Sequence, residues 1–127
     1  MLRTVQVFIF LFSCIVHSMK ESDIQKQILD YLLILENMGK LYYSRFNTVG
    51  IYDPKYKGYR KPSIHNKSGI PDIMVIKDRQ VIFLEVKSDK GKQSEAQHDF
   101  HEVCRSEGIL YYVVRSLDEV INIINAN

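Results

Sequence analysis

Two apolar runs that lie two residues apart most strongly constrain how this chain of 127 residues folds. They cover residues 72–77 (DIMVIK) and 80–88 (QVIFLEVKS), and only Asp78 and Arg79 separate them. Valine, isoleucine and phenylalanine favour strands, and two strands joined by two residues form a hairpin. Apolar side chains would point to both faces of this hairpin, so other parts of the protein should shield both faces from water. The sequence therefore predicts a central pair of strands in a larger sheet.

A two-residue loop also fixes which residues face each other across the hairpin. Lys77 then pairs with Gln80, and Asp72 falls directly opposite Glu85. Because side chains alternate between the faces of a strand, Lys87 shares the face of Glu85. Asp-Arg is not the Asn-Gly or Asp-Gly pair that a type I′ turn prefers, and a three-residue loop would separate the two acids. On the two-residue register, two carboxylates and an ammonium group meet at one end of the hairpin.

Asp72 and Glu85 would carry like charges on Cβ atoms about 4.5–5.5 Å apart, which is destabilising unless the repulsion is relieved. A shared proton would relieve it. A divalent cation would also do so, because Mg²⁺ prefers carboxylate, water and phosphate oxygens. Lys87 could then position an attacking water or stabilise charge on a phosphate. The alternative is a salt-bridge cluster at a strand end, which contributes little at a surface.

The segments around the hairpin indicate an α/β fold. A helix is expected over 22–38, where apolar residues recur every three or four positions and Gly39 follows. Its start could be a capping box of Ser22 with Gln25, or of Ser18 with Glu21, and SEAQ at 94–97 predicts a second capping box. The further elements are a strand at 41–47, a helix at 94–107, a strand at 109–115 and a last helix capped by Ser116. We expect a mixed sheet of about four strands flanked by helices.

The long connection 48–69 contains the chain's most strongly basic segment. The whole chain has a net charge of +2, but residues 54–67 contain five basic and no acidic residues, which leaves −3 for the remainder. The cations alternate with tyrosines; Lys and Arg contact phosphates, and Tyr stacks on exposed bases. The alternative is a solvated, partly disordered loop. The predicted DNA-binding residues are Lys55, Lys57, Tyr59, Arg60, Lys61 and Lys67.

Three motifs in chain order carry a resemblance to a known family. They are SGIPD at 68–72, EVK at 85–87 and SEAQ at 94–97. Together they resemble the PD-(D/E)xK nuclease superfamily, and within it the virus-type replication-repair nuclease (VRR-NUC) domain. The resemblance covers about residues 20–124. It implies a restriction-endonuclease-like core in the αβββαβ order, with a mixed central sheet flanked by helices.

The resemblance also implies an activity and roles for individual residues. The activity is metal-dependent hydrolysis of DNA phosphodiester bonds, with Mg²⁺ as cofactor and Mn²⁺ as a substitute. Asp72 and Glu85 would bind the metal, with Glu21 of the first helix completing the site; Lys87 would act on the water, and Gln97 would support them. From the residues alone, Glu21 is equally a first-turn acid favoured by the helix dipole, and Gln97 a capping partner of Ser94.

Stand-alone members of this family resemble structure-specific nucleases that cut branched DNA as dimers. We therefore expect a homodimer that acts on Holliday junctions or other branched DNA in a phage or bacterial repair setting, without stable membrane association. Two alternatives remain open: a non-catalytic DNA-binding module with a nuclease-like fold, and a sequence-specific restriction or nicking nuclease.

Residues 1–18 stand apart from the expected domain at 19–127. The apolar run VQVFIFLFSCIV at 5–16 is short for a membrane span, which needs about 20 residues. With Arg3 ahead of it, the run has the form of a signal-peptide core. It could equally be a start-site extension ahead of Met19, or a packed element. The expected location is the cytoplasm (of the host cell if the protein is viral), and secreted or periplasmic only if residues 1–18 act as a signal.

Overall fold

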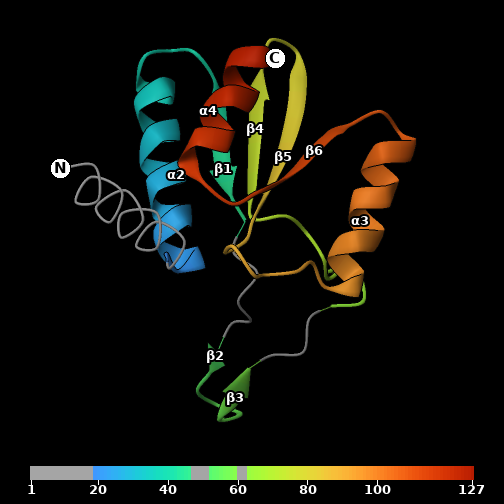
Figure 1. The fold of residues 1–127 in the computed structure, drawn as a ribbon. Coiled ribbons are helices and arrows are strands. Elements are labelled where there is room, and N and C mark those ends of the chain that lie inside the picture. Colours follow the sequence, from blue (N-terminus) through green and yellow to red (C-terminus); the bar gives the residue numbers. More distant parts are fainter. Residues whose placement is uncertain (1–18, 47–51, 60–62) are drawn as a thin grey trace, which may run out of the picture.

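The computed structural model describes residues 19–46, 52–59 and 63–127 (Figure 1). The predictions for residues 1–18 therefore lie outside the described residues. The elements are α2 (Glu21–Asn37), β1 (Tyr42–Arg45), β2 (Tyr52–Asp53), β3 (Gly58–Tyr59), β4 (Ile73–Lys77), β5 (Gln80–Val86), α3 (Glu95–Ser106), β6 (Leu110–Val114) and α4 (Leu117–Ala126).

Four of the strands form one mixed sheet in the order β1-β4-β5-β6. Strand β4 pairs antiparallel with both β1 and β5, whereas β5 and β6 are parallel. The parallel pair requires a crossover, which α3 provides. The predicted α/β fold, with a mixed sheet flanked by helices, is confirmed.

The central hairpin has the register that a two-residue loop predicts. Lys77 pairs with Gln80, and at the other end Ile73 pairs with Leu84. Asp78 and Arg79 both have positive φ, +49° and +65°, as the two central residues of a type I′ turn must. These residue types rarely adopt such a conformation, so the paired strands on either side outweigh its cost.

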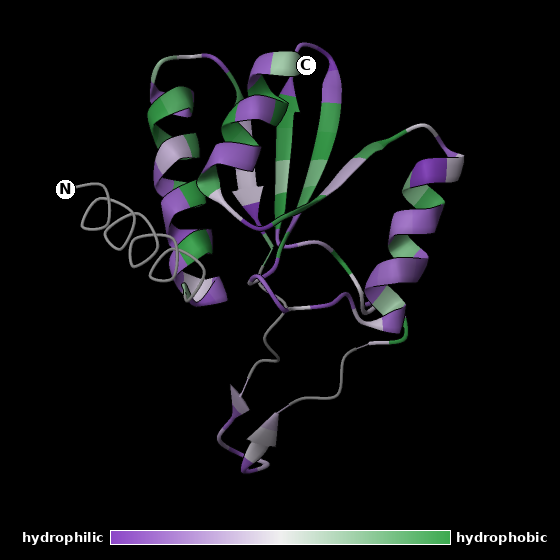
Figure 2. Ribbon diagram, in the orientation of Figure 1, coloured by the Kyte–Doolittle hydropathy of each residue, from purple (hydrophilic) through white to green (hydrophobic). Residues whose placement is uncertain are grey.

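One face of the sheet holds the core. Five residues of the hairpin, Ile73, Val75, Ile82, Leu84 and Val86, are fully buried there. They pack with apolar residues of α2 and α4, which lie side by side over this face (Figure 1). In Figure 2 both helices carry hydrophobic (green) and hydrophilic (purple) residues, and their buried members include Ile28 of α2 and Ile124 of α4, as in amphipathic helices that cover a core.

The opposite face of the sheet is covered only in part, by α3. Phe100 of α3 lies between Phe83 and Tyr111, with ring centroids 5.4 and 6.0 Å away. Away from α3, Ile76 and Val81 remain 40% and 37% exposed. The hairpin is thus central in the sheet, as predicted, but only one of its faces is fully buried.

The helix ends follow the sequence signals in all but one case. Ser94 and Gln97 form the predicted capping box at the start of α3, and Ser116 caps α4. Gly39, with φ +71°, follows the end of α2. The capping box of Ser22 with Gln25 was a wrong prediction, because α2 begins at Glu21 and its N-cap, Lys20, makes no side-chain cap. Ser22 is therefore already inside the helix; Ser18 lies outside the described residues.

The connection between β1 and β4 contains a small hairpin that the sequence did not predict. Tyr52 pairs with Tyr59, and Asp53 with Gly58. This 52–59 hairpin projects away from the sheet, beyond the end at which β4 begins and β5 ends (Figure 1).

Candidate active site

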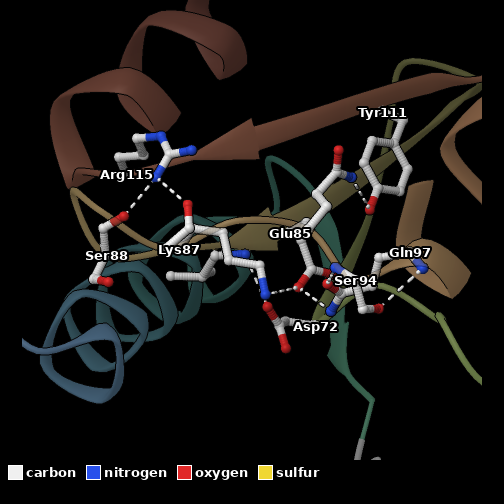
Figure 3. A network of polar contacts seen from close by, with 11 residues as sticks. Asp72, Glu85, Lys87, Ser88, Ser94, Gln97, Tyr111 and Arg115 are labelled. Carbon is white, nitrogen blue, oxygen red and sulfur yellow. Dashed lines mark hydrogen bonds and ion pairs between the residues drawn. The ribbon is translucent and has the colours of Figure 1, made fainter.

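Asp72, Glu85 and Lys87 come together at one end of the central hairpin (Figure 3). Asp72 directly precedes β4, Glu85 lies inside β5, and Lys87 follows the last residue of β5. The carboxylate of Asp72 accepts a hydrogen bond from Val86 N at 2.8 Å across the hairpin, and the Asp72 carbonyl accepts one from Phe46 N at 2.8 Å. Asp72 is thus held by both neighbouring segments of the sheet.

The two oxygens of Glu85 have different surroundings. Oε1 accepts a hydrogen bond from Gln97 Nε2 at 2.7 Å and lies 3.4 Å from Lys87 Nζ. Oε2 is buried and has no hydrogen-bond partner among the described residues. Burial first and the negative charge of Asp72 second raise the pKa of Glu85, Lys87 lowers it, and the net pKa is about 7. A buried carboxylate oxygen without a partner is costly, and a cation would satisfy it.

Gln97 connects α3 to this carboxylate. Its Oε1 accepts a hydrogen bond from Ser94 N at 2.8 Å, while its Nε2 donates to Glu85. One side chain therefore both caps α3 and contacts Glu85, so the two contacts do not exclude each other. The supporting role of Gln97 in the chemistry stays a prediction. The bond to Ser94 fixes the orientation of the amide, so its NH₂ group faces Glu85.

Gly69 brings the loop before Asp72 against the start of α3. Gly69 has φ +84°, and a Cβ atom at this position would lie 2.2 Å from Ala96 O and 2.9 Å from Gln97 N. Only glycine permits both this conformation and this close approach. The glycine of the SGIPD motif therefore sets the distance between the Asp72 loop and the helix that carries Gln97.

Tyr111 is a residue of the site region that the sequence analysis did not identify. Its hydroxyl accepts a hydrogen bond from Gln93 Nε2 at 3.3 Å, and His101 stacks on its ring with centroids 4.3 Å apart. Burial, together with the negative charge of Glu85, raises the pKa of Tyr111 to about 12, so the phenol stays protonated. The parallel register of β5 and β6 places Tyr111 beside Phe83. A strand pattern alone does not reveal that register.

The remaining predicted site residues are more dispersed. Glu21 is exposed in the first turn of α2, and no group of three or more Asp, Glu, His or Cys side chains that could hold a metal forms within 19–46, 52–59 and 63–127. Its role as a metal ligand stays a prediction. Lys55, Lys57 and Tyr59 are exposed on the 52–59 hairpin, and Lys67 is exposed in the segment before β4. Arg60 and Lys61 lie outside the described residues.

The 52–59 hairpin presents rings and charges together. Tyr52 and Tyr59 meet edge to face with centroids 5.7 Å apart, and Lys55 Nζ lies 5.9 Å from the centre of the Tyr56 ring. Asp53 is buried, and its carboxylate accepts a hydrogen bond from Lys55 N at 3.0 Å, which fixes the turn. The rings of Tyr52, Tyr56 and Tyr59 remain largely exposed.

The fold and the site together define a class of protein. Four strands in a mixed sheet, with Asp and Glu-x-Lys at one end of the central pair and a glutamine on the following helix, form a restriction-endonuclease-like core of the PD-(D/E)xK type. The comparison with protein families agrees with this class, because residues 57–118 match the VRR-NUC domain. The match confirms the resemblance that the motifs predicted, and it assigns residues 57–118 to a domain type of a nuclease family.

The match has a defined extent. It includes Asp72, Glu85, Lys87 and Gln97, but not Glu21, and it is narrower than the predicted resemblance over 20–124. No curated protein and no solved structure matches the chain. Within the described part of the chain, no helix has the length and apolar character that crossing a membrane requires.

Proposed function

We propose that this protein is a metal-dependent DNA endonuclease that hydrolyses phosphodiester bonds. The observation that carries the proposal is Oε2 of Glu85, which is buried beside Asp72 and accepts no hydrogen bond from the part of the chain that the structure describes. The donor set fits Mg²⁺ or Mn²⁺, which prefer carboxylate oxygens and retain sites for water and phosphate oxygens. Asp72 and Glu85 would hold the metal, with Glu21 as a further ligand from α2.

The metal, when bound, would polarise the phosphate and lower the pKa of a water molecule. Lys87 has a side chain that is only 12% exposed, and its ammonium group lies 3.4 Å from Glu85 Oε1. It is therefore placed to orient the attacking water or to stabilise negative charge that develops on the phosphate. Gln97 holds Oε1 of Glu85, so that Oε2 is the oxygen left to bind a cation.

We further propose that the 52–59 hairpin and its basic neighbours bind DNA. Lys55, Lys57 and Lys67 offer positive charge for phosphates, and the exposed Tyr59 ring offers a surface on which an unpaired base stacks. Branched DNA, such as a flap or a Holliday junction, presents phosphates along its arms and, at the branch point, base faces whose stacking is interrupted. Symmetric cutting of a four-way junction needs two active sites and this chain supplies one, so we propose a homodimer. This substrate requires a location where DNA is present, the cytoplasm of a bacterium or of an infected host cell.

The test compares wild type, Asp72→Asn and Asp78→Asn on labelled four-way junction, flap and linear duplex, with Mg²⁺, Mn²⁺ or EDTA. Asp78→Asn is the matched control, because Asp78 is exposed in the turn at the other end of the same hairpin. We expect Mg²⁺-dependent cutting of branched DNA by wild type and Asp78→Asn, and none by Asp72→Asn.

Other outcomes identify the alternatives. Binding in EDTA without cutting under any condition would mean that the protein is a DNA-binding module. Cutting of linear duplex at one sequence would indicate a restriction or nicking nuclease. Equal cutting by Asp72→Asn and wild type would refute the proposed site.

A further inference from the structure

Lys87 lies just beyond the end of β5, where the chain leaves the sheet. Its backbone N–H still donates to Val114 O at 3.0 Å, and the chain then reverses through residues 88–91, with Gly91 N donating to Ser88 O at 3.1 Å. This 88–91 turn is the start of the connection from Lys87 to α3 and Gln97. The positions of both side chains therefore depend on how this turn is held.

Arg115 holds the 88–91 turn from the neighbouring strand. It follows the last residue of β6, and its guanidinium group points toward Ser88 (Figure 3). Its Nη1 donates to three backbone carbonyls. The distances are 2.5 Å to Ser88 O, 2.8 Å to Gly91 O and 3.2 Å to Asp89 O. Nη1 carries two protons, so Ser88 O and Gly91 O can accept one each. Asp89 O shares one of these protons at the longer distance.

The backbone of Arg115 is itself fixed. Its N–H donates to Glu119 Oε2 at 2.8 Å in the first turn of α4, whose start is capped by Ser116. Within the described residues, no carboxylate forms an ion pair with the Arg115 guanidinium. The charged guanidinium instead donates to carbonyl oxygens of the turn. Because the donor is charged, these hydrogen bonds are stronger than those between neutral groups.

We propose that Arg115 is a positioning residue for the active site. It fixes the 88–91 turn. That turn keeps the Lys87 ammonium group beside Glu85, and it sets the distance between the start of α3 and the sheet. A planar guanidinium directs its protons along fixed lines, whereas a lysine ammonium is a compact charge on a flexible stem, so lysine can replace it only in part. The catalytic consequence rests on the proposed nuclease function, but the effect on the turn does not.

The test uses the full chain with Arg115→Ala, Arg115→Lys and the control Arg105→Ala, which removes an exposed arginine that forms an ion pair with Glu102 on α3. The first measurement is amide hydrogen exchange by NMR in EDTA. We expect Gly91 and Lys87 N–H to exchange faster in Arg115→Ala than in Arg105→Ala, with the amides of β4 unchanged. Unchanged exchange at Gly91 would overturn the proposal.

The second measurement is the single-turnover rate of cleavage at saturating DNA, together with the Kd for DNA in EDTA. We expect Arg115→Ala to lower the rate by about 10- to 100-fold, because small misplacements of catalytic groups have effects of this size. The Kd should stay at its wild-type value, and Arg115→Lys should recover part of the rate. A loss of affinity that accounts for the lost rate would show that Arg115 binds DNA directly, which would also overturn the proposal.

Two further results distinguish a failure of this proposal from a failure of the proposed nuclease function and from a failure of the variant to fold. If wild type cuts no substrate, the proposed function fails, while the exchange at Gly91 still decides whether Arg115 fixes the turn. If Arg115→Ala does not fold, the comparison of Arg115→Lys with Arg105→Ala decides the proposal by the same two measurements.

Discussion

Gly69→Ala provides the sharpest test of how the active site is assembled. The new Cβ would lie 2.2 Å from Ala96 O, so this peptide must move by about 0.8 Å to reach even 3.0 Å, a separation below which Cβ contacts are essentially never found. A shift of that size, along the 2.7 Å bond from Gln97 Nε2 to Glu85 Oε1, would stretch it to the limit of a hydrogen bond. The substitution therefore acts on the site through α3.

The expected cost has two parts. A left-handed conformation at a non-glycine residue costs about 1–2 kcal/mol, and overpacking of this kind costs about 1–3 kcal/mol more. Gly108→Ala is the matched control, because Gly108 has φ +70° but no atom within 4 Å of its new Cβ. Gly108→Ala has only the conformational cost, so the difference between the two variants isolates the contact with Ala96.

The assays are urea unfolding and the single-turnover rate of DNA cleavage. We expect Gly69→Ala to lower the free energy of unfolding by about 1–3 kcal/mol more than Gly108→Ala does. We also expect it to reduce cleavage by about 100-fold, with Gly108→Ala near wild type. Equal unfolding free energies for the two variants, or full activity of Gly69→Ala, would refute this account of the contact.

Three further predictions follow from the site and the 52–59 hairpin. In EDTA, the free energy of unfolding should fall by up to about 3 kcal/mol as the pH rises from 5 to 8, because folded Glu85 keeps its proton up to a pKa of about 7 and the unfolded chain releases it near 4.5. Urea unfolding at several pH values in this range measures the fall in the free energy of unfolding, and the Glu85→Gln variant should not show this fall. Ser94→Ala should cost about 1 kcal/mol through the lost cap and leave cleavage near wild type, whereas Gln97→Ala should also lower the cleavage rate; equal rates for the two would contradict the contact with Glu85. Lys55→Ala and Lys57→Ala should each reduce the slope of log K against log salt by about 0.7–0.9 in an anisotropy titration, and an unchanged slope would mean that the hairpin does not contact phosphates.

The close approach of Asp72 and Glu85 could be predicted from the sequence because it depends on a local rule. A two-residue turn fixes the register of a hairpin, and side-chain alternation then fixes the faces. The turn residues Asp78 and Arg79 argued against this register, yet the structure adopts it. The start of α3 was equally predictable, because a capping box involves only residues three apart.

The uneven cover of the sheet could not be predicted in the same way. Apolar residues on both faces of the hairpin indicated burial of both, but α3 covers only the side near β6 and leaves Ile76 and Val81 partly exposed. The 52–59 hairpin was also missed, because its strands are two residues long and carry no alternating pattern.

The α/β class, the register of the central hairpin and the meeting of Asp72, Glu85 and Lys87 could all be predicted from the residues alone, because each depends on neighbours along the chain. Three contacts needed the three-dimensional structure: the hydrogen bond to one oxygen of Glu85, whose other oxygen has no partner among the described residues, the approach of Gly69 to Ala96, and the bonds from Arg115 to the 88–91 turn. These contacts join residues on separate elements across the crossover of α3. Their geometry depends on how helices pack on the sheet, and a local pattern of residues does not contain that information.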